Sequence, residues 1–123
     1  HSFPDRRVLI IYGDGAFGLN GFEYDTAVRF GLPIVGIVGN DAAWGQMLRP
    51  LVGIYGADRK VAVDLAPTRY DRVVEALGGH GEFCEHPGEI RPALERAFAS
   101  GKPALVNVMI RKDEGAPKGS TYV

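Results

Sequence analysis

Two short polar segments carry the residues with the clearest capacity for chemistry. Gly13-Asp14-Gly15 directly follows the apolar run Val8–Tyr12, and Asn40-Asp41 follows the apolar run Ile34–Val38. Carboxylate and amide oxygens are ligands that Mg²⁺ accepts, and Mg²⁺ commonly bridges carboxylates to phosphates. If the two runs are neighbouring parallel strands, both segments lie at one edge of the sheet. There they could hold a metal together with a loop carbonyl, water and two diphosphate oxygens.

The stretch Gly13–Gly18 also satisfies G-x-G-x-x-G, the pattern of dinucleotide-binding turns. Two features argue against a dinucleotide. We expect Asn20 to cap the next helix, so that this helix starts after the glycines and not among them. Asp14 would also repel a pyrophosphate unless a cation lay between them. Two alternatives stay open: a nicotinamide-dinucleotide-binding fragment of a dehydrogenase, with Asp41 as its ribose-binding acid, and a non-catalytic domain.

Apolar strands alternate with amphipathic helices along the chain. This alternation predicts an α/β fold, a parallel sheet with helices on both faces. The expected strands are Val8–Tyr12, Ile34–Val38, Glu82–Glu85 and Ala104–Ile110.

Helix signals separate these runs. The first expected helix starts at Asn20, points Phe22, Ala27, Val28 and Phe30 inward, and ends at Gly31. The other expected segments are a short irregular or helical piece at Trp44–Leu48, a loop through Pro50, Gly53 and Gly56, a helix from Pro67 to Gly78-Gly79, and a helix from Pro87 to Gly101.

Composition narrows the class of protein. The 123 residues are 46% apolar with a net charge of −1, which argues against a nucleic-acid-binding or membrane-surface protein. The apolar runs are far shorter than the roughly 20 residues of a membrane span. Cys84 is the only cysteine, which fits a reducing compartment, and we expect a cytoplasmic protein. Because the sequence starts at His1 without a methionine, we expect it to be a piece of a longer chain.

Gly13-Asp14-Gly15, 24 intervening residues and Asn40-Asp41 resemble the G-D-G…N-N signature of thiamine-diphosphate (ThDP)-dependent enzymes. The stretch GDGAFGLNGFEYDTAVRFGLPIVGIVGNDAAWG is similar to the diphosphate-binding domain of the branch that holds acetolactate synthase, benzaldehyde lyase and 2-hydroxyacyl-CoA lyases. VDLAPTRYDRVVEALGG and GKPALVNVMI resemble the rest of that domain. The resemblance covers roughly Asp5–Arg111. It implies a diphosphate-binding domain over residues 1–110, incomplete at its N-terminus, and a tail or lid over residues 111–123.

The resemblance implies ThDP and Mg²⁺ as cofactors. Asp14 and Asp41 match the side-chain metal ligands, and Ala43 matches a ligand that uses its backbone carbonyl. Position 41 holds Asp where the family usually has Asn, so a side-chain oxygen is kept and a negative charge is added. If Asn40 is the ligand instead, the match between this sequence and the family motif shifts by one residue. The implied contacts with the cofactor are Gly13, Asp14, Gly15, Ala16, Asn40, Asp41 and Ala43.

The resemblance further implies a carbon–carbon lyase or ligase acting on 2-hydroxyacyl-CoA, 2-keto acid or acyloin substrates. The essential glutamate of such enzymes belongs to a pyrimidine-binding domain, usually on another subunit, that nothing in this sequence matches. We therefore expect a homodimer or homotetramer, and no activity from this segment alone.

Side chains just after the predicted metal loop are candidates for a substrate pocket. Trp44, Gln46 and Met47 are the candidates, although Trp44 and Met47 are equally compatible with ordinary packing. Arg49 could meet an anionic substrate or a CoA phosphate, but a solvated surface role is favoured. His80 and His86 lack partners at metal-ligand spacing, and we expect both at the surface.

Overall fold

The computed structural model describes residue 3 and residues 5–112. Within this part of the chain, four parallel strands form one sheet in the order β1-β2-β4-β3. The predicted pairing of the first two strands is confirmed, with Gly13 opposite Gly39. The residues beyond Lys112 in the predicted tail lie outside the described part. The strands are β1 (Val8–Gly13), β2 (Ile34–Asn40), β3 (His80–Cys84) and β4 (Ala104–Met109).

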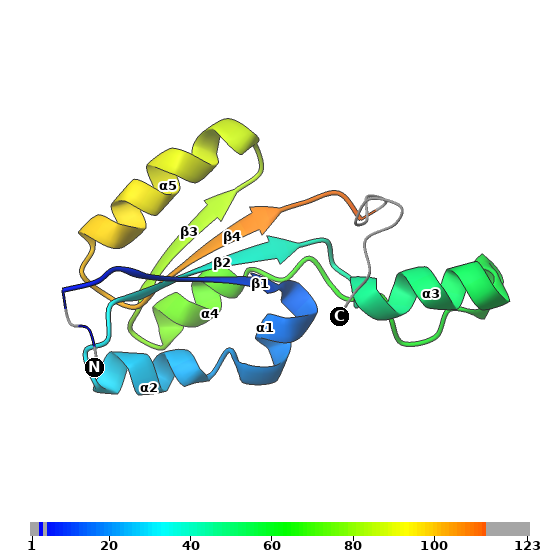
Figure 1. The fold of residues 1–123 in the computed structure, drawn as a ribbon, viewed down its shortest axis with the longest axis horizontal. Helices are drawn as coiled ribbons and strands as arrows, with labels where there is room; N and C mark the ends of the chain where they lie inside the picture. The colour runs from blue at the N-terminus through cyan, green and yellow to red at the C-terminus, as the bar shows by residue number, and fades with distance from the viewer. Residues whose placement is uncertain (1–2, 4, 113–123) are drawn as a thin grey trace.

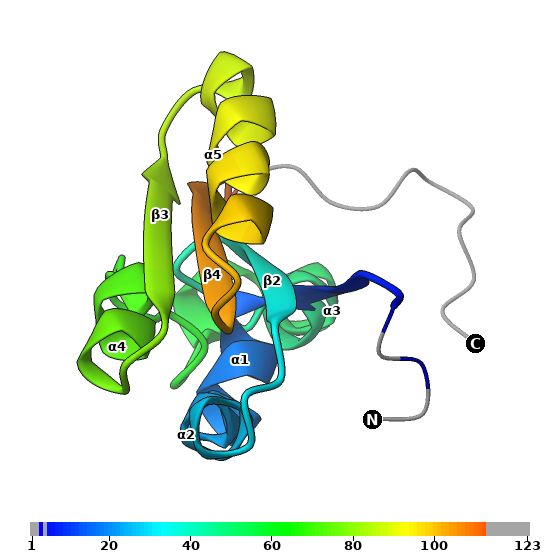
Figure 2. The same cartoon turned by 90° about the vertical axis from the view of Figure 1, so that its left-hand side faces the viewer.

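Helices cover both faces of the sheet, as the alternation of elements predicted. Helix α5 packs on one face, and α1, α2 and α4 lie on the other (Figures 1 and 2). Helix α3 extends beyond the carboxyl ends of the strands (Figure 1). No helix of the described residues is both long and apolar enough to cross a membrane. The helices are α1 (Asp14–Asn20), α2 (Glu23–Arg29), α3 (Gly45–Tyr55), the 3₁₀ turn η1 (Ala57–Arg59), α4 (Tyr70–Ala76) and α5 (Pro87–Ala99).

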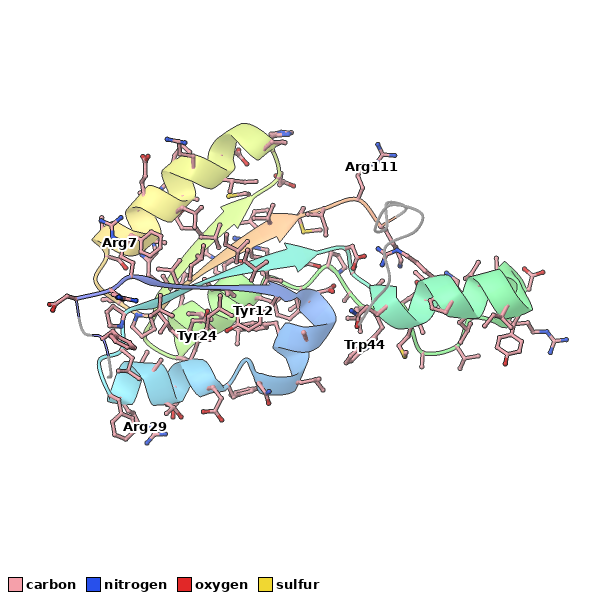
Figure 3. All side chains as sticks on the ribbon, viewed as in Figure 1. Arg7, Tyr12, Tyr24, Arg29, Trp44 and Arg111 are labelled. Carbon is pink, nitrogen blue, oxygen red and sulfur yellow. The ribbon has the colours of Figure 1, made fainter. Side chains whose placement is uncertain are left out.

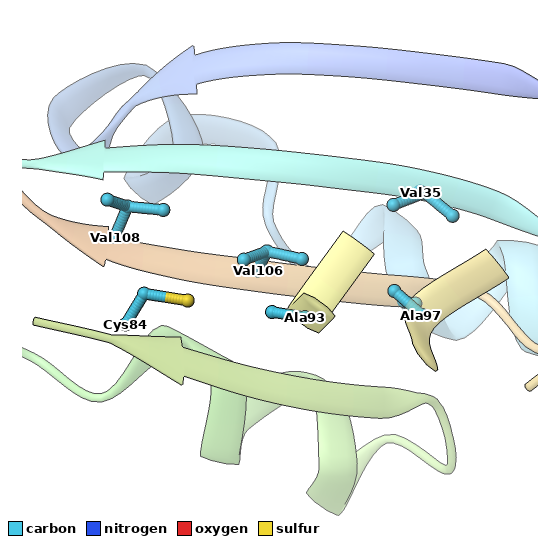
Figure 4. Packing of buried hydrophobic residues seen from close by; sticks show 7 residues of the cluster. Val35, Cys84, Ala93, Ala97, Val106 and Val108 are labelled. Carbon is cyan, nitrogen blue, oxygen red and sulfur yellow. The ribbon is translucent and has the colours of Figure 1, made fainter. Parts of the chain in front are cut away.

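Two apolar clusters, one on each face, hold these layers together. Under α5, Ala93 and Ala97 pack against Val35, Val106 and Cys84 (Figure 4). The opposite cluster contains Phe17, Tyr24, Val38, Val74 and Leu105. Burial of such side chains is the main favourable term in folding, so both clusters fix the strand ends that carry the polar residues.

The first helical region differs from the prediction. Helix α1 begins at Asp14, among the glycines, and Asn20 is its last residue and not an N-cap. The argument against a dinucleotide that relied on a delayed helix is therefore wrong. A break at Gly21 separates α1 from α2 and shifts the buried face. Ala27 is buried as predicted, and Tyr24 is buried beside it. Phe22 and Phe30 are exposed, contrary to prediction.

Two other boundaries were also misplaced. Helix α3 continues through Pro50 and Gly53, where a loop was expected, and ends at Tyr55, with Gly56 as its C-cap. A proline removes one helical hydrogen bond and a glycine costs about 1 kcal/mol, and neither forbids the helix. Helix α4 begins at Tyr70, later than the predicted start at Pro67.

Candidate functional site

The carboxyl ends of β1 and β2 lie side by side and open on a pocket of about 350 Å³. Seven of the ten residues predicted to contact the cofactor or line a substrate pocket do line it, and so does Arg49. Asn40, Ala43 and Met47 are not among its lining residues; Met47 is 58% exposed and lines a neighbouring hollow beside α3. The lining residues are Gly13, Asp14, Gly15, Ala16, Leu19, Gly39, Asp41, Trp44, Gly45, Gln46, Arg49 and Ile110.

Asp14 is a buried carboxylate at the junction of β1 and α1. Its residue is only 2% exposed. Its Oδ1 accepts a hydrogen bond from Gly15 N at 2.8 Å, and its Oδ2 accepts one from Ala43 N at 3.2 Å. Burial raises the pKa of Asp14 above its usual value, and the negative charge of Asp41 raises it further, against these hydrogen bonds. A cation between the two carboxylates would remove this electrostatic penalty.

The loop after β2 is held in an unusual conformation. Ala42 has a φ of 52°, a region that non-glycine residues seldom occupy. Its N–H donates to Asn40 Oδ1 at 3.2 Å, and its carbonyl accepts from Leu65 N at 2.8 Å. Trp44 N donates to Val63 O at 2.8 Å. These bonds fix the backbone on both sides of Ala43, the predicted carbonyl ligand.

Asn40 and Asp41 point in different directions. The Asn40 side chain is fully buried and bonded within the protein, whereas Asp41 lines the pocket. The side chain of Asp41 is 8% exposed, and its Oδ2 lies 3.5 Å from Nη2 of Arg49. Of the two candidate side-chain metal ligands, the geometry therefore favours Asp41. Arg49 is paired at the site, not the solvated surface residue that was favoured.

Trp44 packs directly against the glycine turn. A Cβ built on Gly15 would lie 2.9 Å from Cε3 of the Trp44 ring, closer than carbon atoms normally approach. Trp44 lies at the base of α3, on the side facing α1 (Figure 3). Gly15 therefore has to be a glycine for this contact to form, and the indole is one wall of the pocket.

The donor set suits Mg²⁺ better than a soft metal. Among the described residues, no group of three or more His, Cys, Asp or Glu side chains could hold a metal. Two carboxylates, Asp14 and Asp41, still meet at this pocket. Mg²⁺ is typically held by one or two carboxylates and completes its shell with carbonyl, water and phosphate oxygens. The residues present therefore fit a Mg²⁺ ion bound together with a diphosphate.

Sequence reasoning missed the residues that brace this site from behind. Asn107, Asp71 and Arg69 form buried or half-buried hydrogen bonds that reach Asn40. The one available signal was Asn107, a lone polar residue inside the apolar run Ala104–Ile110. Such a residue in a buried strand needs hydrogen-bond partners.

Lys112 also approaches the site from the far end of the chain. Its ammonium donates to Asp64 Oδ1 at 2.6 Å and to the Ala42 carbonyl at 3.3 Å. Hydrogen bonds from Lys112 and Lys60 lower the pKa of Asp64 to about 2. These contacts attach the segment after β4 to the loop after β2, next to the predicted ligands.

Among the described residues, His80, His86 and Cys84 take no part in the pocket. His80 is paired with Glu82, with 2.8 Å between Nε2 and Oε1. His86 is exposed and is the N-cap residue of α5, as expected of a surface residue. Cys84 is fully buried, and burial raises the pKa of its thiol. A buried, electroneutral thiol is a packing residue.

Comparisons with known proteins identify a matching family and relatives of this chain. The family model described as "Thiamine pyrophosphate enzyme, C-terminal TPP binding domain" matches residues 2–108. An acetolactate synthase large subunit of Mycobacterium tuberculosis is 50% identical over 118 residues, which are 95% of this chain and 21% of that protein. A 2-hydroxyacyl-CoA lyase 2 of Caenorhabditis elegans is 47% identical over 91% of this chain and 18% of its own length.

A solved structure gives the same fold. The thiamine diphosphate-dependent 4-hydroxybenzoylformate decarboxylase of Rhodococcus jostii RHA1 superposes with a TM-score of 0.81 at 25% identity, over 91% of this chain and 21% of that one. The chain thus spans about one fifth of the length of the relatives it matches.

Proposed function

Because this chain belongs to the family of C-terminal TPP-binding domains of thiamine pyrophosphate (ThDP) enzymes, we propose that it anchors the ThDP diphosphate through Mg²⁺. Asp14, Asp41 and the carbonyl of Ala43 are the proposed metal ligands. Gly13, Gly15 and Ala16 lie at the same pocket edge and would contact the diphosphate. In this proposal Asn40 contributes through the loop that it holds, because its side chain is buried away from the pocket.

The observation that carries the proposal is the pairing of two acidic side chains in a confined place. Asp14 is almost fully buried and the side chain of Asp41 is 8% exposed; burial raises the pKa of Asp14, and the charge of Asp41 adds to that rise. Buried carboxylates of this kind are unfavourable unless they are paired or coordinate a metal. A divalent cation bound by both satisfies them and offers its remaining positions to phosphate oxygens.

The residues of this chain would anchor and orient the cofactor. When bound, ThDP would supply a thiazolium ring whose carbanion adds to carbonyl groups and whose positive charge accepts the electrons of a breaking carbon–carbon bond. The Trp44 ring, held against Gly15, would restrict where the cofactor and substrate can lie. Gln46 and Arg49 line the same pocket and offer polar contacts to a substrate.

We propose that the complete protein is a carbon–carbon lyase or ligase acting on 2-hydroxyacyl-CoA, 2-keto acid or acyloin substrates. The names of its relatives support acetolactate formation and 2-hydroxyacyl-CoA cleavage. A pyrimidine-binding domain, on another subunit of a homodimer or homotetramer, would supply the essential glutamate. The dinucleotide alternative loses its support, because the family model and the relatives are those of ThDP enzymes.

Cofactor analysis and two activity assays of the complete enzyme test this proposal. Small molecules released from protein purified in Mg²⁺ are identified by mass spectrometry, before and after dialysis against EDTA. We expect ThDP that is lost with the metal. Acetolactate formation and 2-hydroxyacyl-CoA cleavage are then assayed side by side. Finding a nicotinamide dinucleotide in place of ThDP would contradict the proposed site. So would ThDP that stays bound after dialysis against EDTA.

A further inference from the structure

The Asn40 side chain forms its hydrogen bonds with other groups inside the protein. Its Nδ2 donates to Thr68 O at 2.9 Å and to Asn107 Oδ1 at 3.2 Å. Its Oδ1 accepts from Ala42 N at 3.2 Å. An amide group has two N–H donors, so both are used. Asn40 can therefore influence the metal site only through the backbone of the loop that starts with it.

Three further side chains extend this arrangement to the surface. Asn107 Nδ2 donates to Thr68 O and to Asp71 Oδ1, both at 3.1 Å. Asp71 in turn accepts from Arg69, at 2.9 Å from Nε to Oδ1 and 2.6 Å from Nη2 to Oδ2. The Arg69 guanidinium lies over the Phe83 ring, 3.9 Å from its centroid. Arg69, Asp71, Asn107 and Asn40 thus form one continuous chain of bonds, which we term the polar relay.

The negative charge of Asp71 fixes how the amide groups of Asn107 and Asn40 are oriented in the polar relay. Burial would raise the pKa of Asp71, but hydrogen bonds from Arg69 and Asn107 outweigh it and hold the pKa below its usual value. An ionised carboxylate only accepts hydrogen bonds, so Asn107 must turn its NH₂ group toward Asp71 and its oxygen toward Asn40. Asn40 must then turn its NH₂ group toward Asn107, which leaves its oxygen facing the N–H of Ala42.

We propose that the polar relay is a positioning device that holds the loop of residues 40–43 in its metal-binding conformation and thereby sets the affinity for Mg²⁺. The inference rests on the proposed function. Ala42 adopts a left-handed conformation that is unfavourable for alanine by itself, so the loop needs an external restraint. The Asn40 oxygen supplies that restraint at Ala42, between the two proposed ligands Asp41 and Ala43. Groups that orient metal ligands from behind typically change metal affinity by about 10–100-fold when they are removed.

Asp71→Asn tests the relay in the complete enzyme. An amide at position 71 can donate as well as accept, so it no longer dictates the orientation of Asn107 and Asn40. The matched control is Glu82→Gln. Glu82 forms an equivalent two-bond pair with Arg96, at 3.0 and 2.7 Å, and is not one of the residues that line the pocket. For both variants we would measure the dissociation constant of Mg²⁺ at saturating ThDP and the melting temperature. We would also record the electron paramagnetic resonance spectrum of Mn²⁺ bound in place of Mg²⁺.

The relay predicts that Asp71→Asn weakens Mg²⁺ binding about 10–100-fold and broadens the Mn²⁺ spectrum. Glu82→Gln should lower the melting temperature without either effect. Turnover of Asp71→Asn at saturating Mg²⁺ and ThDP should recover most of the wild-type value, because no group that touches the cofactor is lost. If Asp71→Asn does not fold, Arg69→Met is compared with Arg96→Met by the same measurements.

The proposal would be overturned if the Mg²⁺ dissociation constant of Asp71→Asn were within twofold of the wild-type value. It would also be overturned if Glu82→Gln weakened Mg²⁺ binding as much as Asp71→Asn does. These outcomes differ from a failure of the proposed function. In that case the wild-type enzyme itself would bind ThDP without any demand for Mg²⁺, and both proposals would fall.

Discussion

Replacing Gly15 with alanine should weaken cofactor binding and have only a small effect on the stability of the fold. The added Cβ would lie 2.9 Å from Cε3 of Trp44 and 3.2 and 3.3 Å from two further ring atoms. Carbon atoms pack at about 3.5–4.0 Å, so the indole must retreat by about 0.6 Å or more. Trp44 is half-buried and can move. The free enzyme therefore avoids most of the clash by displacing this wall of the pocket.

The magnitudes follow from these contacts. Overpacking costs about 1–3 kcal/mol when the neighbour cannot move. Gly15 is the second residue of α1, and alanine favours a helix over glycine by about 1 kcal/mol. The free energy of unfolding should therefore change by less than about 2 kcal/mol. Cofactor binding requires the indole to return against the new methyl group, so the strain of about 1–3 kcal/mol appears there, as a roughly 5–150-fold weaker affinity.

Gly18→Ala is the matched control on the same helix, because a Cβ at Gly18 meets nothing within 4 Å. The dissociation constant of ThDP at saturating Mg²⁺ is measured by isothermal titration calorimetry on the complete enzyme, and stability by thermal melting. Gly18→Ala should bind ThDP like wild type. A Gly15→Ala enzyme with wild-type affinity, or an equal loss in Gly18→Ala, would refute the role assigned to the Gly15–Trp44 contact.

Two further predictions concern stability. Gly36→Ala should lower the free energy of unfolding by about 1–3 kcal/mol, because a Cβ there would collide with the Tyr24 hydroxyl and lie 3.0 Å from Leu105 Cδ1; denaturant melts check this, and an unchanged midpoint would contradict it. Asp71 has a lowered pKa, so its stabilising contribution is complete above the unfolded value of 3.8 and is lost as pH falls through the lower folded value. The melting temperature of wild type should thus fall more steeply below about pH 4 than that of Asp71→Asn, and parallel curves would rule out this contribution.

The strand ends were predictable because they depend on strong local signals. Apolar runs that end in Gly13-Asp14-Gly15 and Asn40-Asp41 define both strands, and parallel pairing brings their ends together. The pocket residues follow from that geometry, with Asp41 facing the pocket and Asn40 buried. Sequence left that choice open, because Asn40 is the last residue of β2 and Asp41 follows it, so no strand alternation continues across the pair to separate them.

Features that depend on tertiary contacts could not be predicted. The break at Gly21 is one, since Phe17 before it and Tyr24 after it pack into the same buried cluster against the sheet. The polar relay is another, because Arg69 and Asp71 at the start of α4 meet Asn107 of β4 only after the sheet forms. Arg69 and Asp71 by themselves look like ordinary surface positions, and Asn107 signals only that a polar residue in the strand needs hydrogen-bond partners.

The central claim is that Asp14 and Asp41 hold Mg²⁺ for the ThDP diphosphate. It is tested most directly by Mg²⁺-dependent ThDP binding in complete enzymes that carry Asp14→Ala, Asp41→Ala or Asp41→Asn. We expect both alanine variants to fold and to lose this binding. Asp41→Asn should retain it within about tenfold, since an amide oxygen also ligates Mg²⁺. Undiminished ThDP affinity in either alanine variant would contradict the assignment of that ligand.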